Sequence, residues 1–319
     1  MDYLITGGAG FIGSHLIERL LQQQGHVVCL DNFNDYYDPA VKWNNISSAQ
    51  QQPNFMLIEG DILDEKLLAS IFQQHHFDVI VHLAARAGVR PSVQQPQLYQ
   101  EVNIRGTLNL LEMAREHQVR KFIFASSSSV YGNNQKVPFA ETDPVDNPIS
   151  PYAATKKAGE LICYTYSSLY SIGVSCLRFF TVYGPRQRPD MAIHKFTRLI
   201  AAGEPIPIYG DGQSRRDFTY ISDIIDGITS AIEHCAGYEI FNLGESRVIA
   251  LMDLIKLIEE NLGQKAAIHW LPPQPGDVSM TYADISRART KLNYQPRVSI
   301  DEGIREFVRW FQATHGKER

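Results

Sequence analysis

The chain has 319 residues, of which 44% are apolar and 20% are charged, a composition that excludes fibrous, collagen-like and disordered proteins. Its 30 lysine and arginine residues and 35 acidic residues give a formal net charge of -5, which argues against a general binder of nucleic acids or acidic membranes. The four cysteines are widely spaced and form no CxxC pair, so we expect neither a metal site nor a disulfide framework. With no basic leader and no apolar run long enough to span a bilayer, the sequence predicts a cytoplasmic protein.

Short apolar runs alternate with amphipathic stretches along the first half of the chain. Because such runs are typical of parallel strands covered by helices on both faces, they predict a doubly wound, Rossmann-like α/β fold. The expected strands cover residues 3–5, 27–30, 55–58, 79–83, 122–125 and 174–179. From residue 181 onward, clusters of proline, glycine and arginine indicate loops, and we place a substrate-side insertion there.

Two later segments indicate that two domains interleave along the chain. Residues 238–244 form a further expected strand, and apolar residues at helical spacing follow from 251 to 262. We therefore expect a larger domain built from 1–180 and 218–244, and a smaller α/β domain built from 181–217 and 245–319.

A glycine-rich segment follows the first expected strand and opens the first expected helix. Gly7, Gly10 and Gly13 have a GxxGxxG spacing, with Phe11 and Ile12 between the last two. Such a turn lets the backbone approach a pyrophosphate, which the helix N-terminus stabilises through free N–H groups and its positive dipole. The segment predicts a dinucleotide site, although a tight strand-to-helix turn alone also uses glycine.

Acidic residues at the ends of the next two strands extend this prediction. Asp31 lies 18 residues after the last of these glycines, a spacing at which a carboxylate accepts hydrogen bonds from an adenosine ribose. This carboxylate would repel a 2'-phosphate, and residues 32–34 offer no cation, so the sequence predicts NAD rather than NADP. Asp61 and Ile62 are placed to reach the adenine, with capping of the helix that begins near Asp64 as the alternative role of Asp61.

Tyr152 and Lys156 are candidates for the chemical step. They lie four residues apart after Pro151, and a helix that starts near this proline carries both side chains on one face. A tyrosine that acts as a base near neutral pH needs its pKa lowered from about 10 to about 7, and a cation about 4 Å away supplies roughly the necessary 4 kcal/mol. We therefore expect Lys156 to activate Tyr152. The alternative is an exposed aromatic residue beside a solvated lysine.

Four serines, residues 126–129, follow the expected strand at 122–125. Since ligands of doubly wound sheets bind outside the carboxyl ends of the strands, this run is expected beside the tyrosine. A serine hydroxyl there can hydrogen-bond the same substrate oxygen and relay its proton. The sequence alone does not separate Ser126, Ser127 and Ser128.

Together these residues resemble the extended short-chain dehydrogenase/reductase family. The resemblance spans nearly the whole chain and rests on segments 6–13, 61–62 and 82–85, the serine run, and Tyr152 with Lys156. Within that family, segments 31–38, 87–90 and 178–191 resemble the UDP-glucuronate 4-epimerases, a group of nucleotide-sugar 4-epimerases. The family register selects Ser127 as the proton relay.

The resemblance implies NAD-dependent epimerisation at C4 of a UDP-sugar, most closely the conversion of UDP-glucuronate to UDP-galacturonate. Tyr152 would take the proton of the C4 hydroxyl, hydride would pass to NAD, and the transient 4-keto sugar would turn over before hydride returned to its opposite face. The larger domain would bind NAD and the smaller one the nucleotide sugar. The implied NAD contacts are Gly7, Gly10, Phe11, Ile12, Gly13, Asp31, Asn32, Asp61, Ile62, Leu83, Ala84, Ala85, Tyr152 and Lys156. A homodimer through two helices, at about residues 97–116 and 152–170, is also implied.

The resemblance further implies which residues hold the sugar. Arg188 and then Thr181 are the expected contacts of a uronate carboxylate, with Arg186 as a further candidate, because a guanidinium fork matches a carboxylate in two hydrogen bonds. The alternative for these arginines is a solvated basic loop. The other implied substrate contacts are Arg90, Ser127, Ser128, Tyr152, Tyr209, Arg216 and Asp277. Arg90 could instead brace its loop, and the alternative for Arg216 and Asp277 is an interdomain salt bridge.

Other activities use the same groups. A UDP-glucose or UDP-N-acetylglucosamine 4-epimerase would share Tyr152 and Lys156, but Thr181 stands where galactose-type enzymes usually have asparagine. Related dehydratases and decarboxylases carry an acidic residue just after the catalytic serine or threonine, where this chain has Ser128 and Ser129. A non-catalytic NAD sensor would usually have lost the tyrosine or the lysine.

Some residues depart from the family pattern or lie outside it. Arg86 stands where relatives often have glutamine or methionine and adds an expected cation at the pocket, and Gln274 stands where some 4-epimerases have a diphosphate-binding arginine. The expected packing residues are Trp43, Met191, Trp270 and Trp310.

Overall fold

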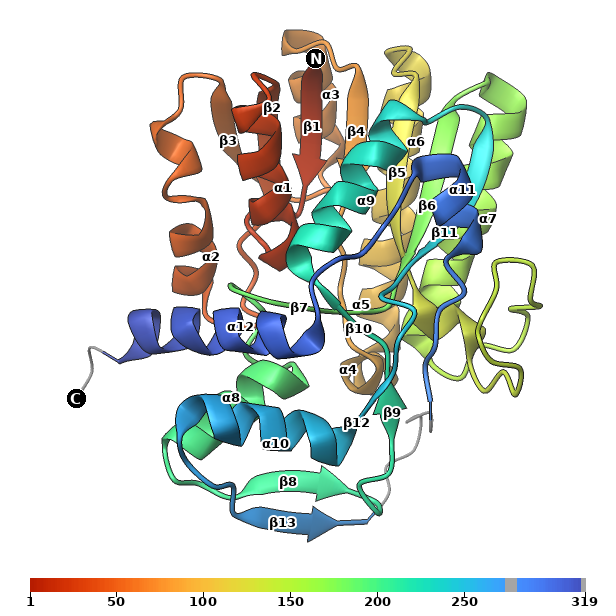
Figure 1. Cartoon of the computed structure of the whole chain (residues 1–319). Helices are drawn as coiled ribbons and strands as arrows, with labels where there is room; N and C mark the ends of the chain where they lie inside the picture. Colours follow the sequence, from red (N-terminus) through yellow and green to blue (C-terminus); the bar gives the residue numbers. More distant parts are fainter. Residues whose placement is uncertain (273–279, 317–319) are drawn as a thin grey trace.

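A seven-stranded parallel sheet forms the larger part of the protein (Figure 1). In the computed structural model, which describes residues 1–272 and 280–316, the strand order is β11-β6-β5-β4-β1-β2-β3. The strands are β1 (Asp2–Thr6), β2 (His26–Asp31), β3 (Phe55–Glu59), β4 (Val79–His82), β5 (Lys121–Ser127), β6 (Gly173–Phe179) and β11 (Tyr238–Leu243). The expected doubly wound sheet is confirmed. Its strand order reverses direction at β1 and β4, the kind of switch point at which ligands bind.

Helices cover both faces of this sheet with separate apolar cores. On one face α1 (Phe11–Gln22) packs against α9 (Ile221–Glu233) through residues such as Leu16, Ile17 and Ile224. On the other face lie α3 (Glu65–Gln74), α6 (Gly106–Glu116) and α7 (Pro151–Tyr170). Smaller elements are α2 (Pro39–Ile46), η1 (Ala49–Gln51), α4 (Val89–Gln94), α5 (Pro96–Gln100), the π-helical η2 (Glu101–Arg105), η3 (Ser128–Tyr131) and α11 (Ser286–Leu292).

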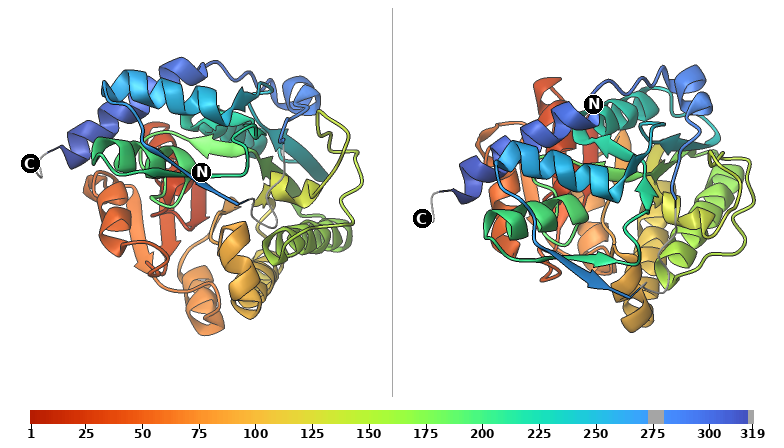
Figure 2. Two further views of the ribbon diagram at one scale, coloured as in Figure 1. Left: turned by 90° about the horizontal axis from the view of Figure 1, so that it is seen from below. Right: turned by 60° about the horizontal axis from the view of Figure 1, so that its bottom comes forward.

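A smaller part lies beyond the carboxyl ends of the sheet strands (Figure 1). Its core joins α8 (Ala192–Ala201), α10 (Leu251–Leu262) and α12 (Ile300–His315) to the parallel pair β8 (Ile206–Tyr209) and β13 (Ile268–Leu271). Two short pairs complete it: β7 (Thr181–Tyr183) with β10 (Phe218–Tyr220), and β9 (Arg215–Arg216) with β12 (Ile249–Ala250). Seen from below, the blue C-terminal helices and the orange N-terminal segments lie on opposite sides of the molecule (Figure 2).

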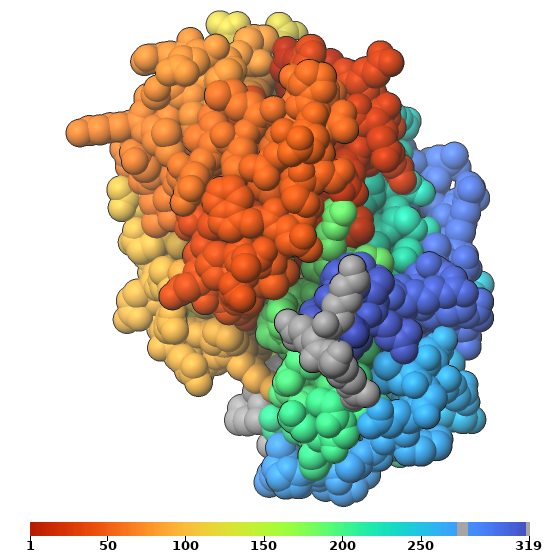
Figure 3. All heavy atoms as spheres, turned by 90° about the vertical axis from the view of Figure 1, so that its left-hand side faces the viewer, coloured from red at the N-terminus to blue at the C-terminus, as the bar shows by residue number. Residues whose placement is uncertain are grey.

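The proline and glycine clusters after residue 181 lie in loops as expected, but α8 and β8, which lie between them, were not predicted. Ile193, Phe196 and Ile200 follow one another at helical spacing and are buried in the core of the smaller part. Proline and glycine clusters, which indicate loops, flank α8 on both sides and hide its short amphipathic pattern in the sequence. The space-filling view shows green residues of the smaller part beside the orange N-terminal residues (Figure 3), and the ion pair of Arg186 with Glu18 also joins the two parts.

Within the described residues, no helix has both the length and the apolar character needed to cross a lipid bilayer.

Candidate active site

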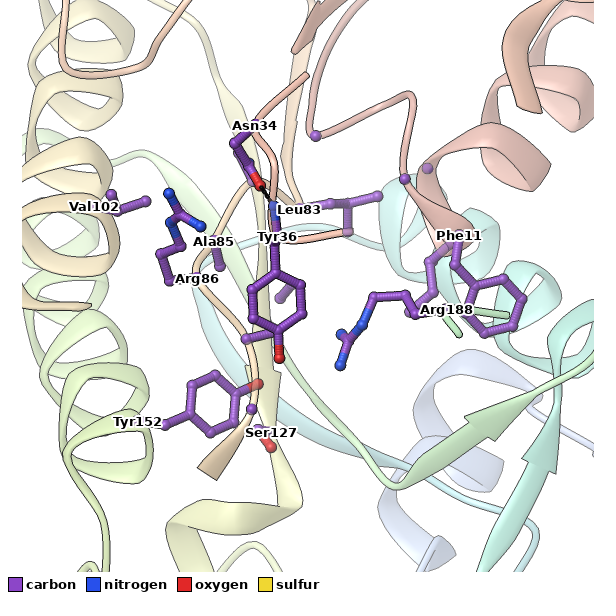
Figure 4. Close-up of a pocket in the computed structure, with 18 of the residues that line it drawn as sticks. Phe11, Asn34, Tyr36, Leu83, Ala85, Arg86, Val102, Ser127, Tyr152 and Arg188 are labelled. Carbon is purple, nitrogen blue, oxygen red and sulfur yellow. Dashed lines mark hydrogen bonds between the residues drawn. The ribbon is translucent and has the colours of Figure 1, made fainter. Parts of the chain in front are cut away.

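A pocket of about 470 Å³ opens at the carboxyl ends of the central strands (Figure 4). This volume is within the range of roughly 300–1,000 Å³ that is usual for ligand and cofactor sites. The predicted site residues that line it are Gly7, Gly10, Phe11, Ile12, Gly13, Asp31, Asn32, Asp61, Ile62, Leu83, Ala84, Ala85, Ser127, Ser128, Tyr152, Lys156, Thr181 and Arg188. Segments far apart in the sequence therefore meet in one cavity.

The glycine turn brings bare backbone to the pocket. Gly7 has a φ of +70°, a conformation that favours glycine, and a Cβ there would lie 2.6 Å from the backbone nitrogen of Ala84. A Cβ on Gly13 would lie 2.5 Å from the carbonyl oxygen of Gly7. Gly10 is the N-cap of α1, so no capping side chain covers the first N–H groups of that helix. These features fit the diphosphate of a dinucleotide.

Asp31 ends β2 with its carboxylate fixed by the backbone. It accepts hydrogen bonds from the N–H groups of Ala9 (3.1 Å) and Phe33 (2.9 Å). Burial raises the pKa of Asp31, while these hydrogen bonds and the charge of Lys42 act in the opposite direction. Lys42 on α2, which was not predicted from the sequence, also lines the pocket and donates to the carbonyl of Asn34 (2.7 Å).

The ends of β2 and β3 are joined beside this carboxylate. Asn32 Nδ2 donates to Asp61 Oδ2 (2.7 Å), and Asp61 also accepts from the backbone N–H of Leu63 (2.9 Å). The cap of α3 is Asp64, whose carboxylate accepts from the first N–H groups of that helix. The alternative role of Asp61 as the helix cap is therefore wrong.

The loop after β4 forms the wall of the pocket opposite Asp31, and the side chain of Asn103 holds this loop in place. Asn103 Oδ1 accepts from the N–H of Arg86 (2.8 Å), and Asn103 Nδ2 donates to the carbonyl of Arg86 (3.0 Å). Asn103 also donates to Thr155 on α7 (3.0 Å). The side chain of Arg86 borders the pocket, as expected for the additional cation (Figure 4).

Tyr152 and Ser127 meet at the centre of the pocket (Figure 4). Ser150 caps α7 through a hydrogen bond from Ala153 N (3.1 Å), which starts the helix at Pro151 as expected and places Tyr152 in its first turn. Burial raises the pKa of Tyr152, while a side-chain hydrogen bond with Ser127 and the charge of Arg188 lower it.

The ammonium of Lys156 is held at the end of β5, and its expected role as the activator of Tyr152 stays a prediction. Lys156 Nζ donates to the carbonyl of Ala125 (2.7 Å) and lies 5.1 Å from the ring centroid of Phe124. Burial lowers the pKa of Lys156 to about 8. Among the described residues, the groups that lower the pKa of Tyr152 are Ser127 and Arg188.

The three serines that the sequence could not separate have different partners. Ser126 Oγ donates to Glu160 Oε1 (2.7 Å), on the buried side of β5. Glu160 is held in turn by Arg178, whose Nε and Nη2 each lie 2.8 Å from one carboxylate oxygen. Ser127 accepts from Ser129 N (3.1 Å) and borders the pocket together with Ser128. Of these three serines, Ser127 is the one whose hydroxyl lowers the pKa of Tyr152.

The arginines proposed for the sugar carboxylate point in different directions. Arg188 lines the pocket, where Nε and Nη2 each lie 2.9 Å from one oxygen of Asp190. Arg186 has a φ of +66° and turns to Glu18 on α1 (2.6 Å), so it does not line the pocket. The grouping of Arg186 with Arg188 is therefore corrected by the structure.

Three further predicted substrate residues, Arg90, Tyr209 and Arg216, are not among the residues that line the pocket. The Arg90 guanidinium lies 4.7 Å from the ring centroid of Tyr209, so these two side chains meet although neither lines the pocket itself. Arg216 lies on β9 and is paired in register with Ile249. Asp277 and Gln274 lie outside the described residues.

Four residues were expected to have packing roles only. Trp43 stacks on Phe33 with ring centroids 3.9 Å apart, and Trp310 packs against the core of the smaller part. Met191 instead lines the pocket, and 52% of Trp270 is exposed, so the expectation is wrong for both. Tyr36 also lines the pocket, although it was not predicted as a site residue. Its position just beyond the end of β2 was the available signal, since ligands bind at that edge of the sheet.

Comparisons with known proteins agree with this geometry. Residues 4–307 match the GDP-mannose 4,6 dehydratase family. A UDP-glucuronate 4-epimerase of Thermodesulfobacterium geofontis is 45% identical over 309 residues, which cover 97% of this chain and 95% of that protein.

Two solved structures have the same fold over nearly their whole length. The UDP-glucuronic acid 4-epimerase of Bacillus cereus, in complex with UDP-glucuronic acid and NAD, has a TM-score of 0.91 and 39% identity and covers 99% of this chain and 100% of that one. The UDP-glucose 4-epimerase of Thermotoga maritima with UDP-glucose has a TM-score of 0.91 and 35% identity, with coverage of 98% and 99%. The chain therefore belongs to the GDP-mannose 4,6 dehydratase family of extended short-chain dehydrogenases/reductases.

Proposed function

We propose that the protein is an NAD-dependent UDP-glucuronate 4-epimerase, which interconverts UDP-glucuronate and UDP-galacturonate. The observation that carries this proposal is the meeting of four groups in one pocket: the Tyr152–Ser127 pair, Thr181, Arg188 and the glycine turn. The similarity to proteins of this name, one of them solved with UDP-glucuronic acid and NAD, supports the same substrate and cofactor.

Each group has a chemical task in this proposal. When bound, NAD supplies a reversible hydride acceptor for C4 of the sugar. Tyr152 takes and returns the proton of the C4 hydroxyl, and Ser127 holds the same oxygen through its hydroxyl. Arg188 and Thr181 bind the uronate carboxylate, for which a guanidinium fork and a hydroxyl are suitable donors.

The cofactor would be held by the glycine turn and by the ends of the strands around it. Gly7 and Gly13 allow the tight backbone turn that would place the diphosphate at the N-terminus of α1, and Asp31 accepts from the adenosine ribose. Lys156, bonded to Ala125 at the end of β5, is placed beside Tyr152 to contact the nicotinamide ribose and to stabilise the tyrosinate. We keep domain ranges of 1–180 with 218–244 for NAD and 181–217 with 245–319 for the nucleotide sugar, with two exceptions: β10 pairs with β7, and Ala288 and Leu292 of α11 pack in the core of the larger part.

Dehydration is not proposed, although the matching family carries the name of a dehydratase. Elimination needs a proton donor next to the catalytic serine. Ser128 and Ser129 stand there, and a serine hydroxyl is a far weaker acid than a carboxylic acid. The same difference argues against a dedicated decarboxylase.

Proton NMR tests the proposal directly. Purified protein with no added NAD is mixed separately with UDP-glucuronate, UDP-glucose and UDP-xylose. We expect UDP-galacturonate from the first, and loss of this product in Tyr152→Phe with bound cofactor unchanged. Formation of a UDP-pentose as the main product from UDP-glucuronate would overturn the proposal.

A UDP-glucose 4-epimerase is the second candidate, and one observation favours it. Asp190 already balances the charge of Arg188, so this arginine does not present an uncompensated cation to the sugar. The similarity to the Thermotoga maritima structure with UDP-glucose is consistent with it. Faster turnover of UDP-glucose than of UDP-glucuronate in the same NMR experiment would select this candidate.

We also propose a homodimer formed through α6 and α7, in a reducing compartment such as the cytoplasm. Exposed apolar side chains gather on these helices: Leu108 (38% exposed), Leu161 (56%), Tyr164 (55%) and Leu169 (65%). All four cysteines are buried and form no disulfide, which supports a reducing compartment. Light scattering should give twice the chain mass, and Leu161→Glu with Leu169→Glu should give a monomer.

A further inference from the structure

The side chain of Asp190 holds Arg188 by two parallel hydrogen bonds. Arg188 Nε donates to Oδ1 and Nη2 donates to Oδ2, both over 2.9 Å, which is a side-on fork between two planar groups. Such a pair fixes the plane of the guanidinium as well as its position. Burial acts to raise the pKa of Asp190, but the hydrogen bonds and the charge of Arg188 lower it, so the pair is ionic near neutral pH.

Tyr36 supports the pair from the opposite part of the protein. The Arg188 guanidinium lies 5.5 Å from the ring centroid of Tyr36, and the Tyr36 hydroxyl lies 3.4 Å from Asp190 Oδ2. Asn34 Oδ1 accepts from the Tyr36 N–H (3.1 Å) and so holds the tyrosine in place. A Cβ on Gly88, which has a φ of +99°, would lie 2.8 Å from the Tyr36 hydroxyl, so this glycine leaves the space that the hydroxyl occupies.

The side-on pair leaves one edge of the guanidinium for a ligand. Arginine has five N–H groups, and the contact with Asp190 uses one on Nε and one on Nη2. No residue in the described part of the chain accepts a hydrogen bond from Nη1 of Arg188. The end-on edge, formed by Nη1 and the second hydrogen of Nη2, can therefore bind a second carboxylate while Asp190 keeps the first edge.

We propose that Asp190, supported by Tyr36, is a positioning residue that orients Arg188 so that its end-on edge binds the uronate carboxylate in a fixed plane. This inference rests on the proposed function. Asp190 is itself an anion, so it weakens the general attraction of the pocket for carboxylates. Asp190 therefore contributes by orienting the Arg188 guanidinium, and this orientation decides how the carboxylate of the sugar is held.

Orientation matters because the 4-keto sugar is a β-keto acid. Cleavage of its C5–C6 bond releases carbon dioxide and leaves the electron pair on C5 as an enolate, which takes a proton from solvent. Cleavage is fast only when this bond lies perpendicular to the carbonyl plane, so that its electrons enter the π system. When the Arg188 guanidinium is held in one plane, it keeps the carboxylate in a position where the C5–C6 bond is not perpendicular to the carbonyl plane. A guanidinium that is free to rotate does not impose this restriction.

The test is the partition of product in Asp190→Asn, measured by proton NMR with UDP-glucuronate. Asparagine keeps the shape but offers one acceptor instead of two. We expect the decarboxylated share, UDP-pentose plus UDP-4-ketopentose, to rise about tenfold above the wild-type level. Glu204→Gln is the matched control, because it removes one negative charge from an exposed position on the smaller part. The control should partition like the wild type.

A general loss of structure would lower the rate without changing the partition. An unchanged partition in folded Asp190→Asn, with or without a loss of rate, would therefore overturn the inference. If Asp190→Asn does not fold, Tyr36→Phe removes only the hydroxyl that donates to Asp190, and an unchanged partition there would likewise overturn it. Failure of the proposed function itself is seen separately, as absence of UDP-galacturonate from the wild type.

Discussion

The buried ion pair between Glu160 and Arg178 allows a quantitative prediction about the support of the serine strand. Glu160 and Arg178 are 0% and 1% exposed, and two hydrogen bonds of 2.8 Å join them. The same carboxylate accepts from Ser126, and Arg178 also donates to the hydroxyl of Tyr131 (3.0 Å). Glu160→Gln keeps the volume but leaves the guanidinium without its counter-charge inside the protein.

The expected cost follows from this burial. Removing one partner of a buried ion pair destabilises a protein by about 3–5 kcal/mol, because the other charge stays desolvated. At an unfolding entropy of roughly 2.1 cal/mol/K per residue, a cooperative unit of 319 residues would lose about 5–8 °C in Tm. Hydrogen bonding and the charge of Arg178 lower the pKa of Glu160 against the effect of burial. The pair therefore stabilises the fold above the carboxyl's unfolded pKa, and this contribution is lost as pH falls through the lower folded pKa.

Thermal unfolding followed by circular dichroism measures the effect. Glu101→Gln is the matched control, since its ion pair with Arg105 is about half exposed and should be worth less than about 1 kcal/mol. The double variant Glu160→Gln, Arg178→Met should lose less than the sum of the two single variants, because neither charge is then left alone. A Tm of Glu160→Gln equal to that of the control, or additive losses in the double variant, would refute this reasoning.

Three further predictions concern the pocket. Gly7→Ala should lose bound NAD, measured by chromatography after denaturation, because its Cβ would lie 2.6 Å from Ala84 N, whereas Gly237→Ala, also at positive φ but with nothing within 4 Å, should keep it. Burial lowers the pKa of Lys156 to about 8, so the folded state disfavours the protonated, charged form of this lysine. Stability of the wild type should therefore rise between about pH 8 and the ordinary lysine pKa of about 10.4, and Lys156→Met should lack that rise in Tm. Arg188→Met should lower kcat/KM for UDP-glucuronate by about 10–100-fold, as expected for a charged bidentate contact, while Arg186→Met, whose guanidinium turns to Glu18, should leave it nearly unchanged. Retained NAD in Gly7→Ala, parallel pH curves, or equal losses in the two arginine variants would each contradict the corresponding prediction.

Local patterns in the sequence determined the larger part of the fold. Buried parallel strands are short apolar runs, and a glycine turn between strand and helix has a fixed spacing, so both are visible without tertiary contacts. The cap of α7 is equally local, because Ser150 and Pro151 act within the first helical turn. The short helix α8 was missed because its ten residues stand between proline and glycine clusters.

Only the tertiary structure decided which neighbouring residues face the site. Arg186 and Arg188 are two positions apart, yet one turns to Glu18, 168 residues away in the sequence, and the other to the pocket. Tyr36 reaches Asp190 across 154 residues. Similarly, Lys156 is bonded to the end of β5. Contacts of this range depend on how the two parts of the chain pack together, and local periodicity carries no information about that packing.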